Sequence, residues 1–300
     1  HGLFHQAILQ SGAGHFTRTA EDAATFSDRI LASTNSRSVS DLLELPLPQL
    51  LDAQFRASLQ TALVDTVAGG DGVFLPMGPV IDGVLLEERP IDAFRAGRAH
   101  ALPMVIGSNR DEWTFFSAHA EPSKEPETRA LLRRRFGEAD HADEVAFRRY
   151  GTGIARDVQD RGTAAFVFDE CQTDHYFRSP AVELARANAQ HRPHDTFLYE
   201  FTWGPAGALH TIEQPFVFGN LEPWKLGIFL YVVGFRAPRS LADTMMTAWT
   251  TFVRSGVPAA PGLPTWDPVF DEVRSMVIDR TSYMQREDLA RFPPDRSSPA

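Results

Sequence analysis

The chain has little cysteine, no long apolar run and fewer basic than acidic residues. Its one cysteine, Cys171, excludes an intrachain disulfide and leaves the compartment, cytoplasmic or secreted, open. The most apolar stretch, 226–235, is about half of the roughly 20 residues that a membrane-spanning helix needs, so we expect core or pocket wall there. With 29 Lys and Arg against 39 Asp and Glu the net charge is -10, which argues against a nucleic-acid partner.

The chain also lacks the pentapeptide Gly-x-Ser-x-Gly, the sharp turn that presents a nucleophilic serine at the end of a buried strand. Ser11 lies in the sequence Gln-Ser-Gly-Ala-Gly, but no glycine stands two residues before it. Ser108 lies beside a candidate acid and is no better placed. We expect neither serine to be a nucleophile, and we interpret Cys171 as a packed small hydrophobe.

What is present is an ordinary globular composition, with 43% hydrophobic and 23% charged residues in 300. This length suits one large domain or two small ones. Neither an internal repeat nor a separating linker is visible, so we expect a single domain over 1–300, ending in a frayed tail at 293–300.

Short apolar runs predict strands at 4–12, 102–106 and 196–201, and a late edge strand at 276–278. Long helical stretches, at about 20–67 and 120–190, separate them. The stretch 74–83 reads as extended and turn-rich, and 91–97 as a short helix. Strands separated by long helical stretches indicate an α/β fold with a parallel sheet.

Two helices carry local start and stop signals. Ser179–Pro180 predicts a capped start for a helix that ends near His191. A last helix is predicted from Ser240, through a variant capping box at 240–243, to Gly256. Its buried face is expected to hold Leu241, Met245, Trp249 and Phe252.

A candidate catalytic pair lies at one edge of the predicted sheet. Glu112 follows the strand at 102–106 and His210 follows the strand at 196–201, and the carboxyl ends of parallel strands meet at the same edge. A carboxylate that holds one ring nitrogen of a histidine fixes its tautomer and stabilises the imidazolium formed when it takes a proton. From the pattern alone, a solvated loop carboxylate and a structural histidine stay open as alternatives.

Five motifs, in order along the chain, are similar to elements of the type-B carboxylesterase/cholinesterase-like family of α/β-hydrolases, and the resemblance covers nearly the whole chain. They are Gly2–Gly12, Phe74-x-Pro76…Asp82-Gly83, Gly107-x-Asn109-x-x-Glu112, His210-x-x-Glu213-x-x-Phe216-x-Phe218-Gly219 and Trp249-x-x-Phe252…Leu263-Pro264-x-Trp266. Five matches in the right order are far more specific than one.

The resemblance implies the C-terminal part of an α/β-hydrolase fold, a mostly parallel sheet with helical lid insertions at about 20–67 and 120–190. It implies that Glu112 is the triad acid and His210 the general base of a serine carboxylic-ester hydrolase, which acts on a small-molecule ester and needs no cofactor. The nucleophile and the oxyanion loop would lie in a segment that precedes His1. One departure is Trp113, where the family usually has glycine.

From the same resemblance we expect the chain alone to be inactive and poorly soluble, with the preceding N-terminal segment as its partner. Two alternatives stay open, a non-catalytic binding module of cholinesterase-like fold and a degenerate fragment. Glu213, three residues after His210, has a spacing that can serve a metal, but no second ligand cluster is visible. The resemblance explains Glu213 as a buried support for the histidine loop.

Overall fold

The computed structural model describes residues 2–68, 77–117, 124–136, 141–156, 161–221 and 237–288. The chain divides into two compact units. The first comprises His1–Ala13, Ile91–Thr128 and Asp143–Ala300, and the second comprises Gly14–Pro90 and Arg129–Ala142. The single domain over 1–300 stays a prediction. The frayed tail at 293–300 and the apolar stretch at 226–235 lie outside the described residues.

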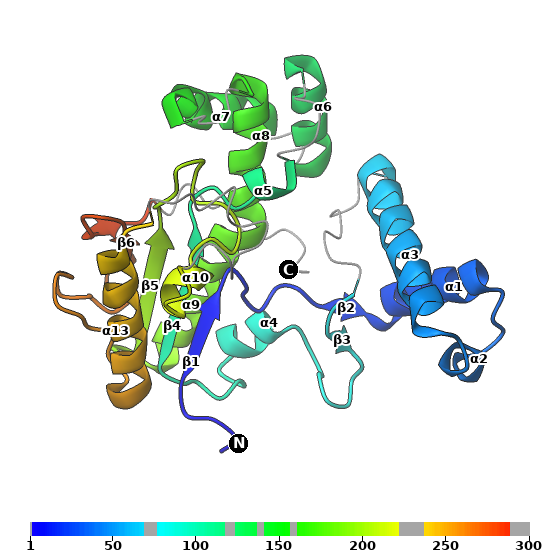
Figure 1. Cartoon of the computed structure of the whole chain (residues 1–300), viewed down its shortest axis with the longest axis horizontal. Helices are drawn as coiled ribbons and strands as arrows, with labels where there is room; N and C mark the ends of the chain where they lie inside the picture. Colours follow the sequence, from blue (N-terminus) through cyan, green and yellow to red (C-terminus); the bar gives the residue numbers. More distant parts are fainter. Residues whose placement is uncertain are drawn as a thin grey trace. The chain divides into compact units, whose positions relative to one another are not determined.

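The first unit contains the main sheet, whose strands follow the order β1-β4-β5-β6-β7 (Figure 1). Neighbouring strands are parallel from β1 to β6, and β7 is antiparallel to β6. The predicted mostly parallel sheet is therefore confirmed. The strands are β1 (Ala7–Gln10), β4 (Met104–Asn109), β5 (Thr196–Phe201), β6 (Arg274–Ile278) and β7 (Tyr283–Arg286).

Strand β5 has its predicted bounds, but β4 ends at Asn109 instead of 106. The difference arises because Gly107, Ser108 and Asn109 continue the ladder beside β5. Position 107 must be glycine, since a Cβ there would lie 2.3 Å from the ring and from the carbonyl oxygen of Tyr199. The polar end of β4 is thus part of the sheet and brings Asn109 into the core.

The prediction of an edge strand at 276–278 is wrong about the edge. Strand β6 lies inside the sheet, because β7 pairs with it through Met276↔Met284 and the adjacent residues. Strand β7 was not predicted, since its sequence, Tyr-Met-Gln-Arg, carries no clear apolar alternation.

A long helix, α13 (Arg239–Ser255), covers one face of the sheet, beside β5 and β6 in Figure 1. Its predicted buried face is confirmed, as is its end at Gly256, whose φ of 78° is left-handed. The predicted capping box at 240–243 is wrong. The N-cap is Pro238, which has no side-chain donor or acceptor, so the helix depends on its packing.

The opposite face of the sheet packs against α9 (Ser179–His191), which ends at the predicted residue. The predicted cap at Ser179 is wrong, because α8 (Thr163–Thr173) continues into α9 through a π-helical segment, η2 (Asp174–Arg178). The backbone N–H of Ser179 donates to Asp174 O, five residues back. Such a segment accommodates Pro180, which cannot donate, without ending the helix.

Buried side chains hold η2 against the end of β5. Arg178 pairs with Asp174 and donates through Nε to Glu200 Oε1 at 3.0 Å. Its Nη2 donates to the carbonyl oxygen of Arg110 at 3.0 Å, in the turn that follows β4. Tyr150 also donates to Asp174, so this buried carboxylate helps to hold η2 in place.

Besides α8, η2 and α9, the predicted helical stretch at 120–190 contains three further helical elements among the described residues. These are α6 (Glu125–Phe136), α7 (Ala142–Tyr150) and a 3₁₀-helical segment, η1 (Gly151–Arg156). Two more short helices are α4 (Pro90–Arg95), close to the predicted 91–97, and α5 (Thr114–Ser117), directly after the turn that holds Glu112.

The second unit contains α1 (Ala20–Thr34), α2 (Val39–Leu43), α3 (Leu47–Ala68) and a two-stranded sheet of β2 (Arg18–Thr19) and β3 (Val80–Ile81). A capping box of Thr19 and Asp22 starts α1. The small residues Ala53 and Ala57 of α3 are buried, and α3 packs on α1. The helical prediction at about 20–67 is confirmed for this part of the chain.

Candidate active site

Glu112 and His210 are in direct contact at the carboxyl edge of the sheet. Glu112 lies in the turn after β4 and is completely buried, and its Oε2 is 2.5 Å from Nδ1 of His210. The His210 side chain is 24% exposed, so its ring stays accessible. The fold thus assembles the two residues across 98 positions of sequence. The Nδ1 contact orients the ring and leaves Nε2 as the atom to accept a proton.

The loop that carries His210 is fixed on both sides. Before it, the backbone N–H of Asp111 donates to Ala208 O at 3.0 Å, and the N–H of Ala208 donates to Asp111 Oδ2 at 2.7 Å. After it, Thr211 adopts a left-handed conformation, with φ of 69°. This sharp turn leads into α10 (Gln214–Val217), which packs on α13.

Aromatic rings surround the imidazole of His210. The ring centroids of Phe116 and Phe177 lie 5.1 and 5.2 Å from it, and that of Phe115 lies at 6.2 Å. Trp113 stacks on Tyr176 at 5.0 Å, and its backbone N–H donates to Thr173 Oγ1. Trp113 is thus packed against η2.

Ser11 is a second hydrogen-bond partner of Glu112, the candidate acid. Its Oγ donates to Glu112 Oε1 at 2.5 Å, and its own backbone is left-handed, with φ of 56°. The backbone N–H of Asn109 donates to the same oxygen at 2.7 Å. Three donors therefore satisfy a carboxylate that is fully shielded from water. This contact of Ser11 could not be predicted from a local pattern, because it joins residues 101 positions apart.

Glu213 lies beside the pair as a second buried carboxyl group. It accepts from Asn109 Nδ2 at 2.6 Å and from Gln10 Nε2 at 3.1 Å. Burial and the nearby charge of Glu112 raise the pKa of Glu213, and the hydrogen bond from Asn109 opposes that rise. Within the described ranges no group of three or more His, Cys, Asp and Glu side chains could hold a metal ion.

Two other residues considered from the sequence are buried within secondary structure. Ser108 is buried within β4, and Cys171 is buried in α8. The aromatic rings of Trp203 and Phe216 pack on each other in the core. Phe218 is 69% exposed.

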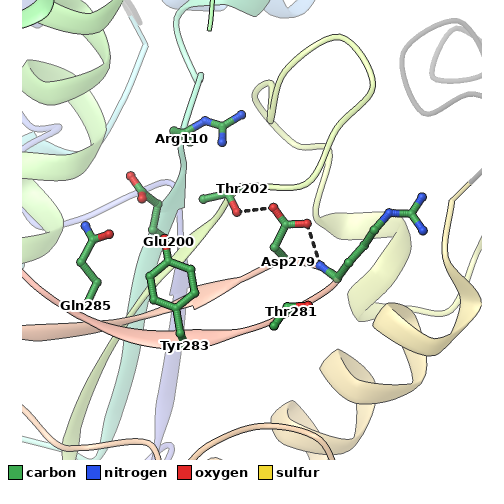
Figure 2. A pocket seen from close by; sticks show the side chains of 8 residues that line it. Arg110, Glu200, Thr202, Asp279, Thr281, Tyr283 and Gln285 are labelled. Atoms are coloured by element: carbon green, nitrogen blue, oxygen red, sulfur yellow. Dashed lines mark hydrogen bonds between the residues drawn. The ribbon is translucent and has the colours of Figure 1, made fainter. Parts of the chain in front are cut away.

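A polar cavity of about 570 Å³ opens at the same edge of the sheet, but Glu112 and His210 do not line it (Figure 2). Figure 2 shows Asp279 accepting from Thr202 Oγ1 at 2.8 Å and from the backbone N–H of Arg280 at 2.6 Å. Glu200, on its wall, is paired with Arg178. Because no histidine, serine or cysteine is among the described residues that line this cavity, we place the candidate active site at Glu112 and His210.

The family model described as the carboxylesterase family matches residues 1–291 of the chain. The chain belongs to the carboxylesterase family. Among curated relatives of this carboxylesterase-family chain, the para-nitrobenzyl esterase of Bacillus subtilis (strain 168) is 29% identical in an alignment of 284 positions, which covers 92% of this chain and 53% of that protein. The phenmedipham hydrolase of Pseudarthrobacter oxydans is 26% identical in an alignment of 306 positions, which covers 99% of this chain and 58% of that protein.

Solved structures agree with the family. The crystal structure of a Geobacillus stearothermophilus carboxylesterase at pH 6.8 matches with a TM-score of 0.71 and 26% identity, covering 97% of this chain and 57% of that one. The predicted α/β-hydrolase fold is therefore confirmed. The chain spans about half the length of the curated relatives that it matches. No helix in the described part of the chain is both long and apolar enough to cross a membrane.

Proposed function

We propose that this carboxylesterase-family chain supplies the acid and the base of a serine carboxylic-ester hydrolase. Glu112 orients His210, and His210 is the general base. The 2.5 Å contact between Glu112 Oε2 and His210 Nδ1 carries the proposal, because it leaves an oriented, partly exposed imidazole beside a buried carboxylate. The family match and the esterase names of its relatives support an ester as the substrate.

The nucleophile in this proposal is a serine outside the 300 residues. Its Oγ attacks the ester carbonyl carbon while Nε2 of His210 takes the hydroxyl proton. The tetrahedral adduct collapses, the bond to the leaving oxygen breaks, and His210 returns the proton to the departing alcohol. Water then attacks the acyl-serine, and His210 takes its proton and passes it back to the serine oxygen as the carboxylic acid leaves.

The segment that precedes His1 is the first thing to establish. We expect an open reading frame upstream of the His1 codon, with Gly-x-Ser-x-Gly about 15 to 20 residues before it. A stop codon or unrelated sequence there would contradict the hydrolase. It would leave a non-catalytic module or a degenerate fragment in its place.

The second test compares activity toward p-nitrophenyl butyrate. The longer protein, made of the 300 residues and the segment proposed to precede them, should hydrolyse this ester. In it, His210→Ala should lower kcat by about 10⁴-fold or more, and the control His100→Ala, at an exposed histidine, should leave kcat unchanged. The 300-residue chain alone should show no turnover. Turnover by the chain alone at the rate of the longer protein would contradict a nucleophile outside it.

A further inference from the structure

Asn109 connects the loop of Glu112 to the loop of His210. It is the last residue of β4 and has no exposed surface. Its backbone N–H donates to Glu112 Oε1 at 2.7 Å. Its side-chain amide donates to Leu209 O at 3.0 Å and to Glu213 Oε2 at 2.6 Å. One residue thus touches the candidate acid and both ends of the turn that carries the candidate base.

Only an amide in one orientation can make these contacts. The two side-chain acceptors are a carbonyl oxygen and a carboxylate oxygen, so the group facing them must donate twice. Asn109 Oδ1 has no hydrogen-bond partner within the described residues, so the side chain is held through its Nδ2 group and not through its oxygen. A carboxylate at this position would repel both acceptors, and an alkyl group would leave Glu213 with one donor fewer.

Asn109 binds the turn on both sides of His210, in addition to the contacts of Ala208 with Asp111. The amide fixes Leu209, immediately before His210, and Glu213, three residues after it. The turn itself includes the left-handed Thr211. On its other side Gln10 donates to Glu213 Oε1 at 3.1 Å, and Trp249 donates to Gln10 Oε1 at 3.4 Å. The Asn109 side chain therefore ties the turn of His210 to the end of β4, at the residue whose backbone N–H binds Glu112.

We propose that Asn109 is the positioning residue that sets the distance between Glu112 and His210, with its backbone N–H holding the carboxylate and its side-chain amide holding the histidine turn. The inference rests on the proposed roles of Glu112 and His210. Asn109 acts through these two residues, since neither of its polar groups is directed to a substrate in this arrangement.

Asn188 is a matched control for the loss of a buried amide. It lies on α9, has no exposed surface, and donates through Nδ2 to Leu102 O and to Thr196 Oγ1, each at 2.8 Å. Its Oδ1, like that of Asn109, has no partner in the described part of the chain. Because Leu102 precedes β4 and Thr196 begins β5, Asn188 serves the opposite end of the same strands. Asn109→Ala and Asn188→Ala thus remove the same chemistry at the two ends of the sheet.

The first readout is the proton resonance of the His210 Nδ1–H in the 300-residue chain, assigned with His210→Ala. We expect a strongly downfield resonance in the wild type and in Asn188→Ala, and its loss or broadening in Asn109→Ala. Asn109→Ser is measured alongside Asn109→Ala. If the alanine variant does not fold, the serine variant, which changes the side chain less, provides the test. An unchanged resonance in a folded Asn109 variant would overturn the proposal.

The second readout is the kinetics of the longer protein with p-nitrophenyl butyrate. Asn109→Ala should lower kcat by about 10²-fold with little change in KM, because it displaces the base and not the substrate. Asn188→Ala should stay within about threefold of wild type. Equal values of kcat in the two variants would overturn the proposal. If the longer protein hydrolyses no ester, the proposed function fails, and the resonance measurement still decides the role of Asn109.

Discussion

Ser11 has a left-handed backbone conformation, and its hydroxyl group donates a hydrogen bond to the buried carboxylate of Glu112. Ser11→Ala removes one of the donors to Glu112 and leaves the shielded oxygen less satisfied. We expect the free energy of unfolding to fall by about 1.5–3 kcal/mol, the range for a hydrogen bond to a charged group. Urea unfolding of the chain measures the loss. Ser27→Ala, which removes an exposed hydroxyl bonded within α1, is the control and should change stability by less than about 0.5 kcal/mol.

Asp169 is the buried carboxyl group with the clearest pH dependence. It accepts from Ser117 Oγ at 2.8 Å and from Arg161 Nη1 at 2.7 Å. Burial outweighs these contacts and raises the pKa of Asp169 to about 6 from 3.8. The folded state therefore keeps a proton that the unfolded state releases, and stability should fall as the pH rises from about 4 to about 6.

The size of this pH effect is on the order of 2–3 kcal/mol. Asp169→Asn cannot ionise at this position. Relative to this variant, the unfolding free energy of the wild type should fall by about 2–3 kcal/mol between pH 4 and pH 6 and should not fall further above pH 6. Urea midpoints at several pH values measure it, with the exposed Asp243→Asn as the control. A difference between wild type and Asp169→Asn that is constant with pH would contradict the assignment.

At the scale of elements, α13 stabilises the sheet through one face only. Met245 is 1% exposed in the core and Val253 on the same helix is 63% exposed. Met245→Ala should cost about 2–4 kcal/mol of unfolding free energy, because it leaves a cavity against the strands. Val253→Ala should cost less than about 0.5 kcal/mol. Similar losses in the two variants would mean that α13 is not packed on the sheet by this face.

Elements with a regular pattern could be predicted from the sequence, and those set by distant partners could not. The apolar face of α13 and the strand β5 follow from local spacing. The polar end of β4 is a strand only because β5 lies beside it. Ser179 has the residues of a helix start, but a π-helical segment carries the helix through it. A helix cap can be predicted from neighbouring residues. The burial of Asp174 and Arg178, which holds the π-helical segment η2, depends on residues far away in the sequence.

The candidate site divides in the same way. Glu112 and His210 could be selected because each follows a predicted strand and matches a family motif. Ser11 and Asn109 could be seen in the motifs but not given a role, since their partners are about 100 positions away. The direction of a side chain at a strand end depends on the neighbouring strand and loop, which no local pattern describes.

At the scale of the whole molecule, β1 forms one edge of the main sheet and pairs only with β4 among the described strands. Its outer side presents unpaired backbone groups, a template for another strand. We expect the 300-residue chain alone to self-associate as its concentration rises, and the longer protein to stay monodisperse. Sedimentation velocity distinguishes the two. A single monomeric species of the chain at every concentration would contradict this expectation.

The contacts of the candidate site also constrain the order of folding. Glu112 meets Ser11 and His210 across 101 and 98 residues, and Glu213 meets Gln10 across 203. Each of these contacts closes a large loop of chain, whose entropy is lost before the contact stabilises anything. Helices such as α1 and α3 can form first, from neighbours in sequence. The contact between Glu112 and His210 should therefore be among the last events of folding, so that a partly folded protein has helices before this candidate pair is assembled.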